Sequence, residues 1–381
     1  MNKRVVLWEV AVVTAICFIT AALFNFFAIK GMTDDIETWS GQVASARYQP
    51  PWVESYEQAI YRTEHYTTTE VYSDSKGRTH SRTVRRSRRV FSHWEHRTRN
   101  HGPEWHATDT LVGTYGIDEY RYNDIKEKLG AVNPAPGDRS CAGFEERNSH
   151  LQSGDPNDYI VSNKNNHIYP VTTQKTWENK VKASPSLFSF HKVEAGPNLP
   201  VNEYPNNSDK FTSSRLIGTA NGINLYKWDQ LNAELGPSKF VNLIAVGFKD
   251  QSMSIAYEQE AKWIGGKKND LVICFGGDVL KPSWVYVFGW TEKDIVKRNI
   301  ETLVLSKGLT DVSLPELKQI IIKDYVIKDW SKFDYLTVEV PFSYYIWLIV
   351  IVLMSGGGMI TFALLNNVDK ESSFKTNEYN Y

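Results

Sequence analysis

An aspartate at the end of an expected β-strand is the residue best placed for chemistry in this sequence. Asp278 follows Gly276-Gly277, directly after the apolar strand expected over residues 270–275. Open α/β sheets bind ligands at the carboxyl ends of their strands, so a carboxylate here suits metal-assisted hydrolysis. An ordinary turn aspartate has the same sequence pattern, and both interpretations stay open. The other acidic candidates in this part of the chain are Asp250, Asp270, Asp294 and Asp334.

Histidines are concentrated in a short stretch nearer the N-terminus. They are His93, His96, His101 and His106, with Glu95 and Glu104 between them. Imidazoles and carboxylates are ligands of zinc and other transition metals, so this stretch is a candidate metal site. On a strand, His93 and His96 point to opposite faces, and only a turn would bring them to one ion. We therefore expect no cofactor, with a divalent metal as the alternative.

Arginines dominate the residues just before these histidines. The candidates for binding an anionic surface are Arg82, Arg85, Arg86, Arg88 and Arg89. A long hairpin is predicted around them, because residues 63–72 and 78–97 are strand-like and residues 73–77 have turn chemistry. The arginines would contact anionic lipid head groups or lipopolysaccharide, with nucleic acid the less favoured ligand. The alternative is a solvated ribbon whose charges prevent edge-to-edge pairing.

Two apolar segments enclose all of these groups. Residues 5–28 contain Glu9 as their only charge, and a second apolar run covers residues 344–365. Each is long enough to cross the hydrocarbon core as a helix. The first segment has no small-x-small cleavage site just beyond it, which favours an uncleaved membrane anchor over a secretory signal.

The charges that flank the first segment predict its orientation. Lys3 and Arg4 precede it and acidic residues follow it, so the N-terminus is expected in the cytoplasm. Two crossings then return the C-terminus to the cytoplasm and leave residues 30–342 periplasmic or extracellular. We expect a bacterial inner membrane as the location.

Three successive glycines lie in the second apolar segment. Gly356, Gly357 and Gly358 would let another helix approach closely, which indicates packing against the first anchor, a membrane protein partner or a second copy. A kink without a partner is the alternative.

The region between the anchors divides into three parts by composition. Residues 30–133 predict a β-rich domain with the basic hairpin. Residues 134–220, interrupted by prolines and Asn-Asp runs, predict a loop-rich connector that can contain short strands at 160–161 and 168–172. Residues 221–340 alternate strands with helices and predict an α/β layered domain, which makes the fold class α+β or α/β. The two transmembrane helices and the cytoplasmic tail are expected at 1–29, 343–366 and 367–381.

The elements of the α/β domain follow from apolar periodicity. Strands are expected over residues 240–246, 270–275 and 283–290. Helices are expected over residues 228–235, 255–263, 293–303 and 314–325. Gly236-Pro237 should end the first helix, and Ser313 with Glu316 should form a capping box on the last.

A glycine-lysine turn, Gly265-Gly266-Lys267-Lys268, precedes the strand that begins at Asp270. Backbone amides and lysines of such a turn can bind phosphate. The turn follows a helix, however, so the helix dipole would present its negative end. We therefore expect a helix C-cap followed by solvated lysines.

The order strand, helix, then Gly265-Gly266-Lys267-Lys268-Asn269-Asp270 leading into a strand resembles the TPM domain family over about residues 222–340. The resemblance implies an extracytoplasmic α/β domain beside a membrane helix. Members of that family include phosphatases and assembly or repair factors without catalysis, so it implies two function classes.

The first third of the chain resembles a group of uncharacterised membrane proteins of tailed bacteriophages and bacteria. The matching motifs are Asp35-x-Glu37-x-Trp39-x-Gly41-x-Val43 and His101-x-Pro103-x-Trp105. This likeness implies a phage or bacterial origin and no particular activity.

The sequence favours a membrane-anchored, non-catalytic assembly or envelope-remodelling factor. A net charge of −1 implies no strongly acidic or basic bulk partner. One alternative is a metal-dependent phosphohydrolase of the TPM type that uses Asp278. Another is a phage inner-membrane factor that affects injection or superinfection. Cys141 and Cys274 are expected to be separate thiols rather than a bridge.

Overall fold

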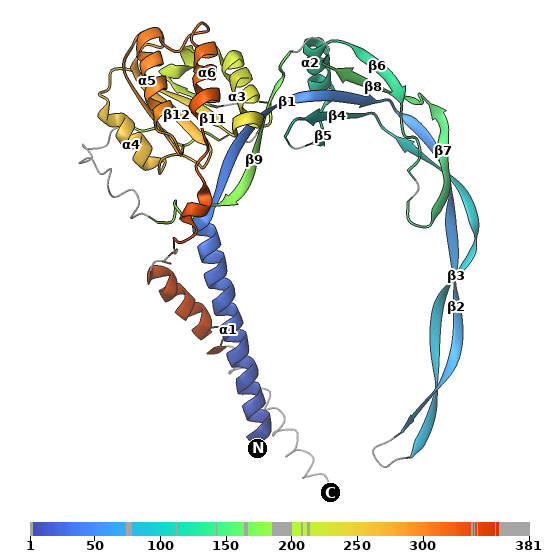
Figure 1. Ribbon diagram of the computed structural model, residues 1–381. Helices are drawn as coiled ribbons and strands as arrows, with labels where there is room; N and C mark the ends of the chain where they lie inside the picture. Colours follow the sequence, from blue (N-terminus) through green and yellow to red (C-terminus); the bar gives the residue numbers. More distant parts are fainter. Residues whose placement is uncertain are drawn as a thin grey trace. The chain divides into compact units, whose positions relative to one another are not determined.

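A computed structural model of the chain is a mixture of helices and β-sheets (Figure 1). It describes residues 3–73, 78–111, 113–141, 143–163, 167–184, 200–206, 209–211, 214–336, 338, 340, 342–354 and 356–357. The chain divides into two compact units, one made of residues 1–40 and 172–381 and the other of residues 41–171. Strands β1 (Asp34–Gln49) and β9 (Pro170–Glu178) each contribute residues to both units.

Helix α1 (Lys3–Thr33) contains the first apolar segment. Its part from Ala15 to Thr33 is long and apolar enough to cross a membrane, a property that anchors share with signal sequences. Large apolar side chains of this helix are exposed, including Phe18 at 72% and Phe27 at 62%. Of the second apolar segment, Phe342–Met354 is helical. Most of the remainder, including Gly358, lies outside the described residues, as does the predicted tail.

The unit of residues 41–171 consists of antiparallel sheets and one helix. Besides β1, its strands are β2 (Trp52–Ser73), β3 (Thr79–His101), β4 (Glu104–Asp109), β5 (Thr114–Gly116), β6 (Val132–Pro136), β7 (Glu146–Gly154) and β8 (Asn157–Ser162). One sheet has the order β5-β4-β1-β8-β6, and the other has the order β3-β2-β7. Helix α2 (Glu119–Leu129) begins at Asp118, which accepts a hydrogen bond from the amide of Arg121, and buries Ile125 and Leu129.

Strands β2 and β3 form the predicted hairpin and extend it. They pair from Trp52 opposite His101 to Ser73 opposite Thr79, and residues 74–77 at the predicted turn lie outside the described part. Strand β7 pairs with β2 only as far as Gln58. Farther out, the described ribbon is two-stranded, and no side chain from Tyr61 to Ser73 is buried.

The expectation of a loop-rich connector over 134–220 needs correction. Strands β7, β8 and β9 lie in this range, and β6 overlaps its start. The prolines that suggested loops are compatible with β6 because it lies at the edge of its sheet, where the N–H that proline lacks is not needed. Pro134 of β6 pairs with Tyr159 of β8 in this arrangement.

The larger unit contains the predicted α/β layered domain. Its sheet has the order β10-β11-β12-β13, in which β10 (Leu216–Gly218), β11 (Asn242–Phe248) and β12 (Asp270–Gly277) are parallel and β13 (Pro282–Gly289) is antiparallel. The helices are η3 (Thr219–Gly222), α3 (Leu225–Lys239), α4 (Ser254–Lys262), α5 (Ile295–Lys307), α6 (Leu314–Asp324) and η4 (Trp330–Phe333).

Helices cover both faces of this sheet. Leu243 on β11 belongs to a core with Trp228 of α3 and Val296 of α5. The next residue, Ile244, belongs to a second core with Ile255 of α4. Because both faces are buried, β11 and β12 are continuous apolar runs, which is why the sequence identified them.

One expected helix end and one expected helix cap are wrong. Helix α3 continues past Gly236, because Pro237 lies in its last turn and there removes only one main-chain hydrogen bond; Phe240, in the left-handed conformation with φ 54°, ends it. Ser313 does not cap α6, because its Oγ donates to the carbonyl of Gly308 at 2.8 Å. Glu316 instead pairs with Lys307 at 2.6 Å.

The first residues of β1 are bound to the turn before β12 by buried polar contacts. The carboxylate of Asp35 pairs with the ammonium of Lys267 and accepts a hydrogen bond from Asn179 Nδ2 at 2.8 Å. Asn269 Nδ2 donates to the carbonyl of Thr38 at 2.7 Å. Asp35, Asn179 and Asn269 are buried. Removing one partner of such a buried pair leaves an uncompensated charge, so these contacts fix where β1 lies in this unit.

The lysines of the glycine-lysine turn are not solvated as expected. Lys267 lies over the ring of Tyr204 at 4.7 Å, and Lys268 lies over the ring of Trp177 at 5.1 Å. Glu37 of β1 is buried near them, and burial raises the pKa of its carboxyl although Lys268 opposes this. Strand β1 therefore provides the carboxylates near the two lysines. Tyr204 and Trp177 provide the aromatic rings over which the ammonium groups lie.

A buried arginine extends this network along the amino ends of the parallel strands. Arg215, just before β10, donates to Asn242 Oδ1 at 2.6 Å and to Ser40 Oγ at 2.5 Å, and lies 3.5 Å from Asp229. Burial lowers the pKa of the guanidinium, and Asp229 opposes that effect. Asn242 Nδ2 donates in turn to Asp270 Oδ1 at 2.8 Å. The residues that precede or begin β10, β11 and β12 are thus joined to β1.

Gly236 provides a test of this attachment. We expect Gly236→Ala to destabilise the protein by about 1–3 kcal/mol, because an added Cβ would lie 1.9 Å from the carbonyl oxygen of Ser40. Helix propensity alone predicts that alanine stabilises the protein by about 1 kcal/mol. The sign of the change in the free energy of unfolding therefore distinguishes the two effects. Thermal unfolding of the full chain measures it, with Gly102→Ala, whose Cβ meets nothing within 4 Å, as the control. A Gly236→Ala protein as stable as the wild type would contradict the close approach.

Candidate functional site

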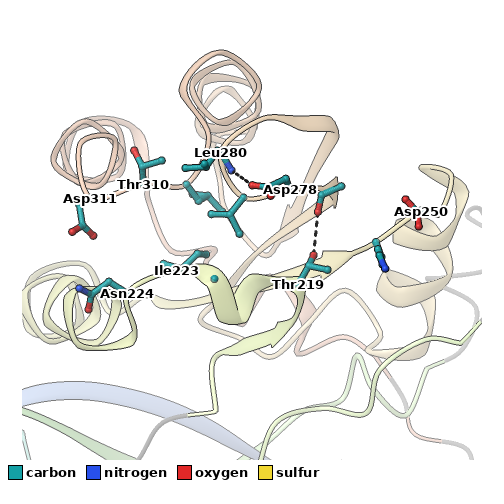
Figure 2. Close-up of a pocket in the computed structure, with 13 residues that line it drawn as sticks. Thr219, Ile223, Asn224, Asp250, Asp278, Leu280, Thr310 and Asp311 are labelled. Carbon is teal, nitrogen blue, oxygen red and sulfur yellow. Dashed lines mark hydrogen bonds between the residues drawn. The ribbon is translucent and has the colours of Figure 1, made fainter.

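A cleft of about 740 Å³ opens at the carboxyl ends of the parallel strands (Figure 2). Thr219 follows β10, Lys249 and Asp250 follow β11, and Asp278 follows β12, and all four line it. Other lining residues are Ile223, Asn224, Leu280, Leu309, Thr310 and Asp311. Open α/β sheets place their ligands at this edge, so the cleft is the candidate functional site of the domain.

The structure places Asp278 in this cleft, as expected. Its Oδ1 accepts a hydrogen bond from the amide of Leu280 at 2.7 Å, so the carboxylate also closes the turn after β12. Asp250 lines the cleft as well, whereas Asp270 is buried at the opposite end of the strand. Asp311 is a third carboxylate that the sequence did not indicate. Only the packing of the loop before α6 brings it here.

The three carboxylates of the cleft do not converge. Asp250, Asp278 and Asp311 project from separate segments around it (Figure 2). Asp311 pairs with Lys227 at 2.7 Å. Within the described ranges, no three His, Cys, Asp or Glu side chains are grouped so that they could hold a metal ion. Charged groups therefore surround the cleft singly, which suits recognition of a ligand by several separate contacts.

Other polar groups of the cleft support its backbone. Thr219 Oγ1 donates to the carbonyl of Gly277 at 3.3 Å, which joins the ends of β10 and β12. Asn224 Oδ1 accepts from the amide of Lys227 at 3.2 Å and caps α3. Leu280, 70% exposed, and the buried Ile223 add apolar surface. The cleft thus combines a fixed backbone with apolar and charged side chains.

The four expected histidine ligands are not brought together. On β3, His93 lies opposite Ile60 and His96 lies opposite Glu57, and the described residues offer no metal cluster. His106 lies on β4. His101 is separately engaged, stacked on Trp52 with ring centroids 4.2 Å apart. The strand geometry that the sequence predicted separates these imidazoles.

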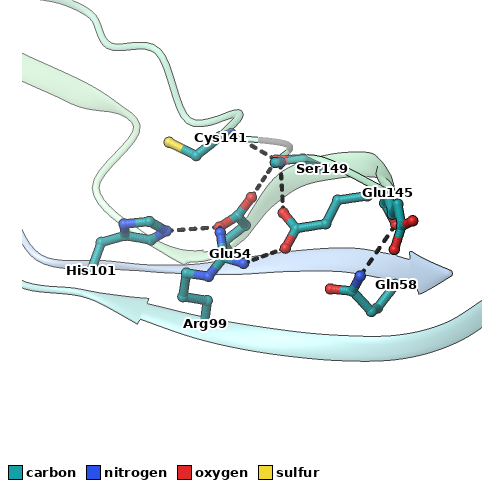
Figure 3. Close-up of polar contacts among 9 residues, drawn as sticks. Glu54, Gln58, Arg99, His101, Cys141, Glu145 and Ser149 are labelled. Carbon is teal, nitrogen blue, oxygen red and sulfur yellow. Dashed lines mark hydrogen bonds and ion pairs between the residues drawn. The ribbon is translucent and has the colours of Figure 1, made fainter. Parts of the chain in front are cut away.

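His101 belongs instead to a polar cluster around Glu54 (Figure 3). The buried carboxylate of Glu54 is contacted by Ser149 Oγ at 2.6 Å, His101 Nε2 at 2.8 Å and Arg99 Nη1 at 3.4 Å. Burial raises the pKa of this carboxyl, but the hydrogen bonds from Ser149 and His101 outweigh that effect and hold it below its ordinary value. The cluster joins β2, β3 and β7.

A serine, a histidine and a glutamate in contact suggest a catalytic triad, but their order is wrong. In a triad the histidine lies between the other two and takes the proton of the serine. Here Glu54 lies between Ser149 and His101. Ser149 Oγ also accepts a hydrogen bond from the amide of Cys141 at 2.9 Å. The arrangement satisfies a buried carboxylate and does not activate a nucleophile.

The surroundings of Cys141 at this cluster do not favour a reactive thiolate. Cys17, Cys141 and Cys274 are free, as expected for separate thiols, and Cys141 is exposed rather than buried. Partial desolvation of the sulfur and the charge of Glu54 raise the pKa of the Cys141 thiol. Because the thiolate is the reactive form, this environment lowers reactivity.

Four of the five candidate arginines on the hairpin are paired with carboxylates. Arg88 pairs with Glu64 at 3.1 Å, and Arg82 pairs with Glu70 at 2.9 Å. Arg86 also contacts Glu70, and Arg89 pairs with Glu145 at 2.9 Å. Arg85 lies opposite Thr67. All five are exposed, and exposed pairs hold their partners loosely, so an anionic surface as their ligand stays a prediction.

The glycines of the second apolar segment differ in their surroundings. An ideal Cβ at Gly356 would lie 3.4 Å from Cys17 Sγ of α1, whereas one at Gly357 would meet nothing within 4 Å. Gly358 lies outside the described residues. One of the three expected packing glycines therefore lies against the first apolar helix.

Comparison with known proteins assigns no family to this chain. No family model matches it, and neither a curated protein nor a solved structure does. The resemblances to TPM domains and to phage and bacterial membrane proteins therefore rest on the quoted motifs alone.

Sequence reasoning underestimated the buried charges of β1. From the sequence, Asp35 and Glu37 were noted only as charges that follow the first apolar segment and as residues of a short motif. Their spacing of two residues places them on one face of a strand, and Trp39 shares that parity. A strand that begins at the end of an apolar helix and places two carboxylates on its buried face requires cationic partners, and Lys267 is one of them.

Glu54 provides a prediction about stability and pH. We expect Glu54→Ala to destabilise the protein by about 2–4 kcal/mol at pH 7, because Arg99, His101 and Ser149 lose their common acceptor. The pKa of Glu54 is lowered in the folded state, so its contribution is present above the ordinary carboxyl range. It is lost as the pH falls through the lowered value. The difference in unfolding temperature between the two proteins should therefore shrink as the pH falls below the ordinary carboxyl range.

The exposed Glu95, paired with Arg97 at 2.8 Å, is the control for this prediction. Glu95→Ala should leave the unfolding temperature nearly unchanged at either pH, because exposed ion pairs contribute little stability. An equal effect of the two substitutions at pH 7 would contradict the role assigned to Glu54.

Proposed function

We propose that this protein is a membrane-anchored binding factor that assembles or remodels the cell envelope without catalysing a reaction. One observation carries the proposal, namely that the two ends of the parallel sheet differ. The amino ends are joined by buried ionic contacts to the strand that follows α1, and the carboxyl ends open into the cleft. Such a domain holds a ligand at one end and its anchor at the other.

The attachment between anchor and domain is short. Helix α1 ends at Thr33 and β1 begins at the next residue. The carbonyl of Thr33 accepts a hydrogen bond from the amide of Asn179 at 2.7 Å. A domain bound in this way transmits a force that acts on its ligand to the membrane helix. An assembly factor uses such mechanical coupling, whereas a hydrolase does not need it.

The proposed setting is the inner membrane of a bacterium, with a phage or bacterial origin. Residues 30–342 would be external and both termini cytoplasmic, as the charges around α1 favour. The α/β domain would be of the TPM type. The hairpin with its exposed arginines would contact anionic lipid or lipopolysaccharide.

We further propose that the second apolar segment crosses the membrane beside α1. Two distances support this. Cys17 lies about 24 Å along the helix from Thr33, and Gly356 lies about 21 Å from Phe342 at the same rise per residue. Cys17 and Gly356 would therefore lie at similar depth, and the structure brings them into contact.

A cysteine at position 356 tests this pairing. We expect Gly356→Cys to form a disulfide with Cys17 when membranes are mildly oxidised, because an ideal Cβ at Gly356 lies 3.4 Å from the Cys17 sulfur. The product should be a monomer with altered electrophoretic mobility in a background that carries Cys141→Ser. Gly357→Cys, whose Cβ would meet no described atom within 4 Å, is the matched control.

A crosslinked dimer would contradict the intramolecular pairing. So would equal oxidation at 356 and 357. The Cys17→Ser protein with Gly356→Cys should form no product, which verifies the identity of the second sulfur.

A metal-dependent phosphohydrolase is the second candidate function, and one observation favours it. Asp278 and Asp250 both lie at the carboxyl edge of the sheet, where hydrolases of this architecture bind their substrates. We expect the purified full chain to show no hydrolysis of a generic phosphate ester with Mg, Ca, Mn or Zn. Metal-dependent turnover that Asp278→Asn eliminates would establish the phosphohydrolase instead.

A photo-crosslinking residue tests the binding role directly. Placed at Leu280 in the cleft, it should give a discrete adduct in native membranes, and Asp278→Asn should reduce that adduct several-fold. Leu305, an exposed position on α5, is the control and should give none. Identical adducts at the two positions would show that the cleft is not the binding surface.

A further inference from the structure

A second, smaller cavity lies at the end of α1. It has a volume of about 180 Å³. Among its lining residues are Asp35, Asn179, Lys182, Tyr204, Lys262 and Lys267. Asp35 is two residues beyond the end of α1, and Lys182 Nζ donates to the carbonyl of Asp34 at 3.1 Å. If α1 crosses a bilayer, this cavity lies at the level of the lipid head groups.

The charges of this cavity are arranged in two layers. At its floor, Asp35 and Lys267 are paired, with side chains only 6% and 18% exposed. Tyr204 completes the floor, and its hydroxyl donates to Asp270 Oδ2 at 2.9 Å. The Asp35–Lys267 pair at the floor is therefore matched charge for charge and is held by the buried network.

The rim carries a surplus of positive charge. Lys262 pairs at 2.5 Å with Glu203, whose side chain is 88% exposed. The exposed Lys182 is bonded through its ammonium to a main-chain oxygen, which leaves its charge without compensation from that contact. Counting the pair at the floor, the lining has three lysines and two carboxylates. One additional negative charge would balance the cavity.

We propose that this cavity binds the phosphodiester of an anionic phospholipid, such as phosphatidylglycerol. The phosphate lies between Lys182 and Lys262, and the single net charge of the head group balances the lining. Its place at the end of α1 supplies the lipid by lateral diffusion. This site is distinct from the arginines of the hairpin, and it fixes the depth of the α/β domain at the membrane surface.

This proposal rests on the proposed anchoring of α1. Different experiments test the anchoring and the lipid site, so a failure of one is distinguishable from a failure of the other. Extraction of membranes with carbonate reports whether the chain is an integral membrane protein. Lipid selectivity of the purified full chain reports the cavity. An anchored protein without selectivity would overturn the inference and leave the anchoring intact.

Native mass spectrometry of the full chain in detergent tests the site, with phosphatidylglycerol, phosphatidylcholine and inorganic phosphate as probes. We expect phosphatidylglycerol to bind at least tenfold more tightly than phosphatidylcholine. The double variant Lys182→Gln, Lys262→Gln should lose that preference, and Lys182→Gln alone should weaken it in the same direction. Lys307→Gln with Lys318→Gln removes the same charge from α5 and α6 and should retain it.

Three results would overturn the proposal. One is equal affinity for the two lipids. Another is an equal loss of the preference for phosphatidylglycerol in the cavity variant and in the helix variant, which would mean that the net charge of the protein alone determines the preference. The third is binding of inorganic phosphate as tightly as phosphatidylglycerol, which would assign the site to a free phosphate. Thermal unfolding of each variant verifies that the proteins compared are folded.

Discussion

The buried ion pair between Asp35 and Lys267 is the contact on which the arrangement of the larger unit depends. It joins the strand that leaves α1 to the turn before β12, and it is continuous with contacts of Asn179, Tyr204 and Asp270. Two charges removed from water are costly unless each has its partner in place. The pair therefore selects one position for β1, since a shift by one residue would bury Ile36 and expose Asp35.

The same constraint explains why polar residues occupy the amino ends of the parallel strands. Arg215, Asn242 and Asp270 precede or begin the three parallel strands, and all are fully or almost fully buried. Apolar residues at these positions would pack well but would not distinguish β1 from another strand. Among the described residues, no such strand lies at the carboxyl ends, and there the chain forms turns whose side chains line the cleft. Helix α1 and the candidate site are thereby joined to opposite ends of one set of strands.

In the unit of residues 41–171, a buried carboxylate has a similar role. Glu54 joins β2, β3 and β7 at the base of the hairpin, and from Tyr61 outward the described ribbon has no buried side chain. Its outer part is held by main-chain pairing and exposed ion pairs, which contribute little stability individually. A two-stranded ribbon of this kind is marginally stable by itself, so its inner end on β7 and the Glu54 cluster supplies most of its support.

The sequence by itself determined the elements whose pattern is local. Continuous apolar runs predicted β11 and β12, turn residues predicted the hairpin, and the length of the first apolar segment predicted α1. Asp278 was placed correctly because a residue after an apolar strand lies at the edge of the sheet wherever the strand packs. Tertiary structure alone decided that Asp311 joins the cleft, that Lys267 is paired rather than solvated, and that Glu54 collects three donors. Each of these depends on residues far apart in the chain, and local periodicity carries no information about which distant charges will meet.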